Sequence, residues 1–498
     1  MEMNKGQVIR LEITDVSDEG KGFGRAEDLA VFVDGALPGD VVDARVTRVK
    51  KRFASAEVVE VVEPSPFRRQ SECPYSEECG GCSFRELDYD KQLELKAAQV
   101  RNKLSRIGGV QDPVVRDTVP SPMTGRYRNK GVFAVRSGHI GFYKRGSHDI
   151  ADIEDCQLLP VSVMAVINEI RKFINNRSIS CYDGRSGKGF LREVTVKCAF
   201  GTGQMMVVLT GADSRLPHAE ALVEAMDQAV EDTDDDFYLA SVVLHVNRNK
   251  SLYDFSDKVI TIAGSPTIVD EVELREPGMK SPVKYEISPL AFYQVNPLQM
   301  KNLCTRVYDY ARPDGNEILF DLYCGIGTMG LPLADRCRYI VGIETVKSAV
   351  VDANRNAVIN GIVNARYYRG KAEEVMPGLM RELDEAAGSG GADDSDDSDG
   401  SADALSQAIK DTFGIPWKDA SGSIVILDPP RKGCDPDLLA SAASTGAERI
   451  VYVSCDPGTM ARDVARLSEL GYDLVEATPF DMFPWTTEIE CVSVLKRR

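Results

Sequence analysis

The pattern of apolar and polar positions divides the 498-residue chain into three regions. Between residues 1 and 62, short alternating runs such as QVIRLEITDV and DVVDARVTRV are separated by closely spaced turns, which predicts a small β-barrel. From 63 to 284, helical stretches such as YDKQLELKAAQVRNKLSRIG mix with strands such as EVTVKCAF, which predicts an α+β region. From 285 to 498 strands and helices alternate, which predicts an α/β doubly wound sheet.

Charge is distributed unevenly along the chain. The formal net charge is −18, yet residues 381–420 alone hold 11 acidic and 3 basic residues, and this segment predicts an acidic, disordered loop. By contrast, residues 64–150 hold 15 Lys and Arg against 10 Asp and Glu, and ARVTRVKKRF at 44–53 is a further basic cluster. RNA could bind these regions, although ordinary solvated surfaces carry similar charge.

The sequence also bears on location. No apolar segment approaches the ~18–20 residues that span a bilayer, and the start MEMNKGQVIR lacks the features of a signal peptide. We therefore expect a cytoplasmic protein without membrane association, and nothing indicates an obligate protein partner. In that setting the 12 cysteines favour free thiols, metal ligands or a nucleophile over a disulfide framework.

Three of these cysteines are clustered. The stretch CPYSEECGGC contains Cys73, Cys79 and Cys82, and the nearest downstream cysteine is Cys156 in DIEDCQLLP. Zinc and iron–sulfur centres both take four ligands, so we expect Cys156 to complete the set. The spacing favours an iron–sulfur cluster, with zinc as the less favoured occupant and unmetallated thiols as a third alternative.

Strands predicted at 317–324, 339–344, 423–430 and 449–455 should bind ligands at their carboxyl ends. The first runs into DLYCGIGTMG, whose Gly325, Gly327 and Gly330 allow the backbone to approach a ligand closely. Glu344 ends the second strand, where a carboxylate can accept two ribose hydroxyls of a nicotinamide dinucleotide or of S-adenosylmethionine. Asp321 favours the cationic S-adenosylmethionine, because a carboxylate repels pyrophosphate; alternatively it braces the loop.

Two further strand ends indicate the chemistry. LDPPRKG places Asp428 after the third strand, and Asp-Pro-Pro at this position is typical of methyltransferases that act on planar nitrogen or on bases. Cys455 ends the fourth strand and should face the same crevice. Asp456 and Pro457 predict the N-cap and first turn of a helix, whose dipole should lower the pKa of the Cys455 thiol. The alternative is a buried structural cysteine.

A cysteine nucleophile fits methylation of carbon. C5 of a pyrimidine becomes nucleophilic only after a thiolate adds to C6, and a base must afterwards remove the C5 proton. Glu488 and Glu490 in FPWTTEIECVSVL alternate on the predicted last strand, so both should lie on one face, and one of them could be this base.

The β-barrel, the cysteine cluster and the motifs DLYCGIGT, DPPRKG, SCDP and EIEC, in this order, resemble the RNA uracil-5-methyltransferase family, in particular its iron–sulfur-containing 23S ribosomal RNA branch. The resemblance spans nearly the whole chain. It implies a TRAM domain over residues 1–62, a middle domain over 63–284 and a Rossmann-like class I methyltransferase domain over 285–498. The acidic insertion at 381–420 departs from the compact family pattern.

The resemblance also assigns residues. It implies Cys455 as the nucleophile and Glu490 as the base, with Glu488 in place of the family's histidine in a His-x-Glu pattern. The implied [4Fe–4S] ligands are Cys73, Cys79, Cys82 and Cys156. The implied contacts to S-adenosyl-L-methionine are Gln294 in AFYQVNP, Tyr323, Glu344 and Asp428, beside Asp321, Gly325 and Gly327 from the loop motif.

The implied partner is RNA, most simply 23S rRNA, with the target uridine extruded into the crevice. Candidate phosphate contacts are Arg126, Arg128, Lys130, Lys144 and Arg145. Three alternatives stay open: a transfer-RNA uracil-5-methyltransferase, a base amino-methyltransferase that uses Asp-Pro-Pro, and a non-catalytic RNA-binding iron–sulfur protein.

Overall fold

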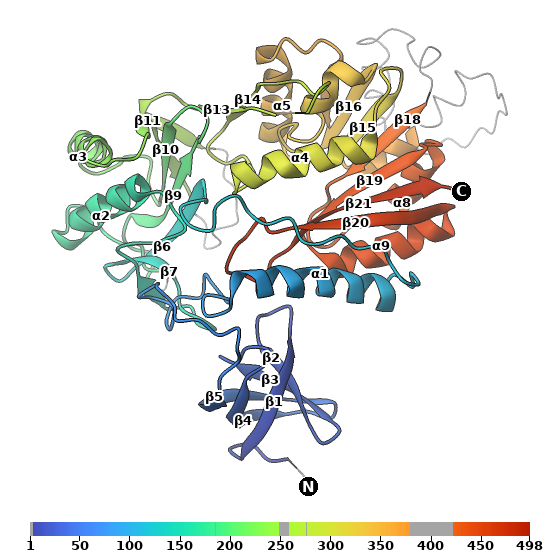
Figure 1. The fold of residues 1–498 in the computed structure, drawn as a ribbon. Helices are drawn as coiled ribbons and strands as arrows, with labels where there is room; N and C mark the ends of the chain where they lie inside the picture. Colours follow the sequence, from blue (N-terminus) through green and yellow to red (C-terminus); the bar gives the residue numbers. More distant parts are fainter. Residues whose placement is uncertain (1–2, 185, 249–257, 275, 379–421) are drawn as a thin grey trace.

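The structure is a computed structural model that describes residues 3–184, 186–248, 258–274, 276–378 and 422–498. The predicted acidic loop at 381–420 lies outside the described residues. Figure 1 shows a small barrel at the N-terminus, a sheet with two helices in the middle of the chain and a larger layered domain at the C-terminus. No described helix is long and apolar enough to cross a membrane.

Five strands close the N-terminal barrel in the order β1-β2-β3-β5-β4. Their bounds are β1 Val8–Val16, β2 Gly22–Ala26, β3 Leu29–Asp34, β4 Val41–Val49 and β5 Phe53–Glu63. The apolar pattern did not predict β2, because GFGRA is short and rich in glycine. Gly24 is required there, since a Cβ atom on it would lie 2.4 Å from the carbonyl oxygen of Glu12 on β1.

The middle region contains a seven-stranded sheet in the order β12-β11-β10-β9-β6-β7-β8. The strands are β6 Lys130–Arg136, β7 His139–Tyr143, β8 Ile150–Asp152, β9 Leu191–Cys198, β10 Gln204–Gly211, β11 Tyr238–Val246 and β12 Val259–Gly264. Helices α2 Val161–Asn175 and α3 Ala219–Glu231 pack together beside it. A hairpin of β13 Ile268–Val272 and β14 Val283–Ile287 leads into the C-terminal domain.

The C-terminal sheet has the order β17-β16-β15-β18-β19-β21-β20, in which the first five strands are parallel and β21 is antiparallel to both of its neighbours. The strands are β15 Ile318–Leu322, β16 Tyr339–Glu344, β17 Ala365–Arg369, β18 Ser423–Leu427, β19 Arg449–Ser454, β20 Tyr472–Phe480 and β21 Glu490–Arg497. The pattern did not predict β17, because the edge strand ARYYR lacks an apolar run. The predicted doubly wound α/β fold is confirmed.

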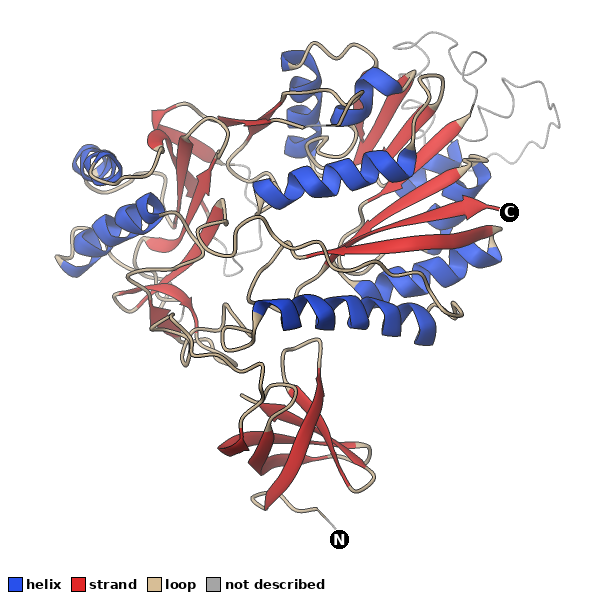
Figure 2. Cartoon of the chain, viewed as in Figure 1, coloured by secondary structure: helices blue, strands red, loops and turns tan. Residues whose placement is uncertain are grey.

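Helices cover both faces of this sheet (Figure 2). They are α1 Tyr89–Arg106, α4 Pro297–Ala311, the short 3₁₀ helix η1 Leu331–Arg336, α5 Lys347–Ile359, α8 Pro436–Ser444 and α9 Pro457–Glu469. Helix α1 comes early in the chain, yet it packs against α9, and its Val100 and Leu104 belong to the core of the C-terminal domain.

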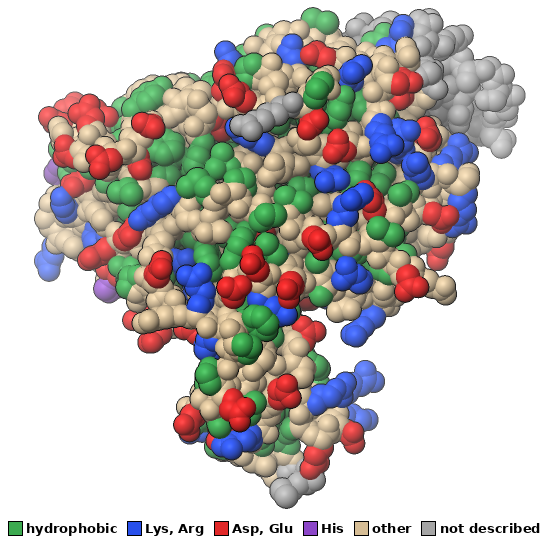
Figure 3. Space-filling view, viewed as in Figure 1, with side chains coloured by type: hydrophobic (Ala, Val, Ile, Leu, Met, Phe, Trp, Pro, Cys, Tyr) green, Lys and Arg blue, Asp and Glu red, His purple; other side chains and the backbone are tan. Residues whose placement is uncertain are grey.

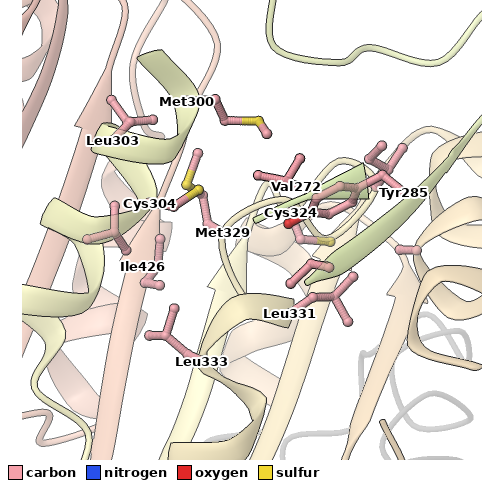
Figure 4. Close-up of a cluster of buried hydrophobic side chains, with 14 of the residues drawn as sticks. Val272, Tyr285, Met300, Leu303, Cys304, Cys324, Met329, Leu331, Leu333 and Ile426 are labelled. Carbon is pink, nitrogen blue, oxygen red and sulfur yellow. The ribbon is translucent and has the colours of Figure 1, made fainter. Parts of the chain in front are cut away.

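A second core cluster supports the loop that follows β15 (Figure 4). Met300, Leu303 and Cys304 of α4 face Met329 and other side chains from that loop. The Tyr285 hydroxyl of β14 donates a hydrogen bond of 3.2 Å to the carbonyl oxygen of Thr328. Apolar packing against α4 and the hydrogen bond from Tyr285 therefore fix the glycine-rich loop.

Candidate active site

The predicted site residues converge at the carboxyl edge of the C-terminal sheet. Tyr323, Asp428 and Cys455 each follow the last residue of one of three adjacent parallel strands, β15, β18 and β19. Glu344 is the last residue of β16, and Glu490 is the first residue of the antiparallel β21. Because the carboxyl ends of parallel strands meet at one edge, all five stand around one crevice.

Asp321 braces the glycine-rich loop with one carboxylate oxygen, while its other oxygen forms no hydrogen bond within the described residues. Its Oδ2 accepts a hydrogen bond of 3.0 Å from the backbone N–H of Gly330. Its Oδ1 is buried and has no hydrogen-bond partner among the described residues. Tyr323 has a φ of 63°, and Gly325 has a φ of 55° with open space where a Cβ atom would stand. This turn leaves room for a ligand directly above the strand end.

Glu344 is held in place by backbone groups. Its carboxylate accepts hydrogen bonds from the N–H of Gly325 at 3.2 Å and of Val346 at 2.8 Å. Gln294, in the segment before α4, is buried, and the Asn129 amide donates to its backbone carbonyl at 2.9 Å. The Glu344 carboxylate and the backbone of Gln294 are thus fixed, and their role as cofactor contacts stays a prediction.

The crevice has an excess of buried carboxyl groups. Burial, followed by the nearby Asp428, raises the pKa of Asp321 to about 7. Burial and then the charge of Glu344 raise the pKa of Asp428 to about 7. A cationic ligand would relieve this repulsion, whereas a pyrophosphate would increase it. The residues therefore fit S-adenosylmethionine, which carries a sulfonium and an ammonium group, better than a dinucleotide.

Cys455 is half-buried between β19 and α9. Asp456 is the helix N-cap and accepts from the N–H of Thr459 at 2.8 Å, and Pro457 is in the first turn, as predicted. The expectation of a lowered thiol pKa is wrong. Burial is the main cause of a pKa of about 12, Glu490 and Asp428 raise it further, and Arg431 opposes them only in part.

The two glutamates of EIEC differ sharply in environment. Glu490 is 4% exposed, and burial, then Asp428 and Glu488, hold its pKa well above the usual range. The side chain of Glu488 is 38% exposed and forms an ion pair of 2.6 Å with Arg431. Strand β21 begins only at Glu490, so Glu488 lies in the preceding loop and not on the predicted strand. Of the two, Glu490 is the buried carboxyl group beside Cys455 and Asp428.

The four clustered cysteines line one cavity of about 340 Å³. Cys73, Cys79, Cys82 and Cys156 are all half-buried free thiols, and burial raises the pKa of Cys82 to about 12. Among the described residues, no group of three or more His, Cys, Asp or Glu side chains is placed to hold a single metal ion. Zinc needs four ligands ~2.3 Å from one point, whereas a cluster fills a larger space. The four thiols share a cavity, and an iron–sulfur cluster at this place stays a prediction.

Three of the candidate phosphate contacts have structural roles. The Arg126 guanidinium donates to the carbonyl oxygens of Cys156 and Leu159 at 2.8 Å, as well as to a nearby aspartate. Lys144 pairs with a neighbouring glutamate at 2.8 Å, and Arg145 donates to the carbonyl oxygen of Cys82 at 3.1 Å. These cations hold the cysteine-bearing loops together, and their assignment to RNA phosphates stays a prediction.

The other two candidates are partly enclosed. Arg128 and Lys130 both line the cysteine cavity, and burial lowers the pKa of Lys130. The Arg128 guanidinium lies 5.8 Å from the ring centre of Phe483. Neither forms an open cationic surface, so their assignment to RNA phosphates stays a prediction.

The barrel presents a more open cationic surface. Lys and Arg side chains project from one side of it in Figure 3. The exposed cations of β4 and the β4–β5 turn are Arg45, Arg48, Lys50, Lys51 and Arg52. The half-buried rings of Phe23, Phe32 and Phe53 lie next to one another at 5.6 and 5.8 Å, and Lys50 stands 5.3 Å from the Phe53 ring. Aromatic faces beside cations suit single-stranded RNA.

Phe292 is a surface residue that the sequence analysis missed. It precedes Gln294 by two positions, and it is 62% exposed while Ala291 and Tyr293 on either side are buried. An exposed aromatic ring of this kind can stack on a base. The signal was present in AFYQVNP, where one ring alternates with buried positions.

Two family models match this chain. The first describes a TRAM domain and matches residues 2–59. The second describes tRNA (uracil-5-)-methyltransferases and matches residues 269–384 and 401–498. A protein of Halalkalibacterium halodurans, named as an uncharacterized RNA methyltransferase, is 34% identical over 99% of this chain and 98% of its own length. The chain belongs to the RNA uracil-5-methyltransferase family. That prediction is confirmed.

Further relatives agree with this assignment. An RNA methyltransferase of Caldanaerobacter subterraneus, also named as uncharacterized, is 35% identical over 99% of this chain and all of its own length. The tRNA (uracil-54, C5)-methyltransferase of Pyrococcus abyssi, solved with S-adenosyl-L-homocysteine, has a TM-score of 0.69 and 28% identity. That match covers 98% of this chain and 100% of the other. The family fold is thus shared over all three regions of the chain.

Proposed function

We propose that this member of the family transfers a methyl group from S-adenosyl-L-methionine to C5 of a uridine in RNA, with Cys455 as nucleophile and Glu490 as base. The observation that carries the proposal is the meeting of Cys455, Asp428 and Glu490 at one strand edge, next to a glycine-rich loop with space for a ligand. The similarity to an enzyme solved with S-adenosyl-L-homocysteine supports the choice of cofactor.

The steps follow from the chemistry of uracil. The Cys455 thiol gives its proton to solvent and adds to C6, and the C5–C6 electron pair moves into an enolate on O4. C5 then attacks the methyl carbon of the sulfonium, whose S–CH₃ bond breaks and leaves a neutral thioether. Glu490, which must be ionised for this step, takes the C5 proton as a carboxylate; the C5–C6 double bond then forms again and the thiolate leaves.

The raised thiol pKa fits this order of events. Burial, followed by the charges of Glu490 and Asp428, raises the pKa of the Cys455 thiol and favours its protonated form. A sulfonium bound beside Asp428 would add a positive charge and favour the thiolate. We therefore expect the thiolate to form more readily when the methyl donor is bound.

We propose 23S rRNA as the substrate, as the cysteine cluster indicated, although the Pyrococcus abyssi neighbour acts on tRNA. The test incubates the protein and S-adenosylmethionine with unmodified 23S rRNA and, separately, with unmodified tRNA. Nucleoside mass spectrometry of each RNA is expected to find 5-methyluridine in the 23S sample. Methylation of tRNA alone would show that tRNA, and not 23S rRNA, is the substrate. An amino-methylated base in place of 5-methyluridine would contradict the proposed C5 methylation.

The raised pKa values of Asp321 and Asp428 predict a pH-dependent affinity. Both are about 7, so lowering the pH below 7 neutralises the carboxylates that attract the sulfonium. Affinity for S-adenosylmethionine should rise as pH rises from 6 to 8, by about tenfold if one carboxylate must ionise. Calorimetry at both values measures it, with S-adenosylhomocysteine as the control. Because the sulfur of S-adenosylhomocysteine is neutral, the affinity for this control should change less with pH. Equal changes for both ligands would contradict the proposed attraction between the carboxylates and the sulfonium.

We also propose that Cys73, Cys79, Cys82 and Cys156 hold a [4Fe–4S] cluster. The support is their common cavity and the cations that fix the surrounding loops. Protein purified without oxygen should contain about four iron and four sulfide ions per chain. Cys82→Ala should lose most of them, whereas Cys181→Ala, which removes a half-buried cysteine outside the cavity, should not. Stoichiometric zinc instead of iron would overturn the assignment.

A further inference from the structure

The loop 481–489, which joins β20 to the proposed base Glu490, is anchored by a buried ion pair. Asp481 is fully buried, and the Lys96 ammonium of α1, 1% exposed, lies 2.6 Å from its carboxylate. The Tyr89 hydroxyl of the same helix donates to Asp481 at 2.7 Å. A buried charge with two such partners does not move without a large loss of stability. The first residue of the loop is therefore fixed to α1.

Trp485, in the middle of this loop, is in a strained backbone conformation. Its φ is 70°, a value that a bulky side chain rarely adopts. Three separate segments hold it there. The Trp485 N–H donates to the Gln92 side chain at 3.1 Å, and its indole N–H donates to the carbonyl oxygen of Thr124 at 2.7 Å. Its carbonyl oxygen accepts from the N–H groups of Ser83 and Phe84 at 3.0 and 2.9 Å.

The indole also connects the loop to the cysteine cavity. Trp485 forms one buried apolar cluster with Tyr127 and Leu158, against which Cys82 and Cys156 pack. The hydrogen bonds from Ser83 and Phe84 come from the two residues directly after Cys82. The guanidinium groups of Arg69 and Arg85 lie 5.0 and 5.3 Å from the indole ring centre. Any change in the position of the cysteine loop must therefore displace Trp485.

The loop ends directly at the base. Glu490 pairs with Phe480 on the other side of the loop, so the nine loop residues set where β21 begins. Thr487 also touches the barrel, since its hydroxyl donates to the carbonyl oxygen of Asp18 at 2.9 Å. Building on the proposed function, we propose that Trp485 is a positioning residue for C5 proton abstraction. It couples the geometry of the cysteine cavity to the placement of Glu490.

This proposal predicts a selective kinetic defect. Addition of Cys455 to C6 does not need Glu490, whereas breakdown of the adduct does. Trp485→Phe keeps an aromatic ring but loses the indole donor. It should leave adduct formation within about twofold of the parent and slow adduct decay about tenfold, because small misplacement of a catalytic group is costly. Single-turnover reactions with natural RNA are quenched in denaturant at successive times. The rise and fall of the denaturant-stable protein–RNA band then give the rates of adduct formation and decay.

The matched control is Tyr472→Phe. Its hydroxyl, buried like the indole N–H, also donates to a backbone carbonyl at 2.7 Å, but that acceptor, Ala447, lies at the end of the sheet opposite the crevice. Tyr89→Phe removes a hydroxyl that binds both Asp481 and the N–H of Ser121, so it tests the same loop if Trp485→Phe does not fold. It too should slow decay selectively.

The outcomes distinguish a failure of the inference about Trp485 from a failure of the proposed function. Equal slowing of formation and decay, or an unchanged decay rate, would show that Trp485 is only structural and overturn the inference. The same slow decay in Tyr472→Phe would also overturn it, because the effect would then be general. If the parent forms no adduct at Cys455, the proposed function itself has failed, and that result precedes any comparison of variants.

Discussion

Cys455→Ala should abolish methyl transfer, with a loss of about 10⁴-fold or more, because the nucleophile makes C5 reactive and no other group replaces it. The change should leave the fold intact, since the side chain is half-buried at a strand end. The measurement is incorporation of the methyl group of S-adenosylmethionine into RNA. Affinity for the methyl donor should stay close to that of the parent protein.

The same variant has a second readout. In the presence of S-adenosylmethionine, RNA that contains 5-fluorouridine should form a denaturant-stable adduct with the parent protein, because fluorine at C5 cannot leave as a proton. Peptide mapping should place the RNA on Cys455, and Cys455→Ala should form none. Cys181→Ala, which alters another half-buried cysteine, serves as the control and should form the adduct normally. Methyl transfer that survives in Cys455→Ala would remove the nucleophile from the mechanism.

Glu490→Gln should lower turnover by about 10²–10⁴-fold, the usual contribution of a general base. The glutamine amide keeps the size of the buried side chain but cannot accept the C5 proton. The methylated adduct should therefore persist and accumulate on natural RNA, whereas the parent shows it only transiently. Denaturing gel electrophoresis during steady-state turnover measures this fraction.

Glu488→Gln is the matched control for Glu490→Gln. It makes the same chemical change two residues away, but on a side chain that is 38% exposed and paired with Arg431. We expect a loss of less than about tenfold, since an exposed ion pair contributes little, and no accumulation of adduct. If Glu488→Gln trapped the adduct and Glu490→Gln did not, the base would be Glu488.

The departure of Glu488 from the His-x-Glu pattern has a structural counterpart. The carboxylate of Glu488 binds Arg431 in the DPPRKG segment, and Arg431 is also the cation that counters the rise in the pKa of Cys455. Glu488 thus ties the Asp-Pro-Pro loop to the start of β21.

The sequence by itself determined the order of the three regions and most of the strands that carry the site. Local apolar patterns placed β15, β16, β18 and β19, and the residues at their carboxyl ends had to converge because parallel strands share one edge. The Asp456 cap of α9 was readable because capping depends on a few adjacent residues. Cys455 and Asp428 could therefore be named as site residues before any distance was known.

Tertiary structure decided everything that depends on neighbours distant in the chain. Burial beside Glu490 and Asp428 raised the pKa of Cys455 against the local effect of the helix. Other loops contribute partners to Arg126, Lys144 and Arg145 that no local pattern had indicated. Helix α1 packs against α9, which lies more than 300 residues later in the chain. Dielectric environment and long-range pairing are properties of the packed chain, so no local pattern encodes them.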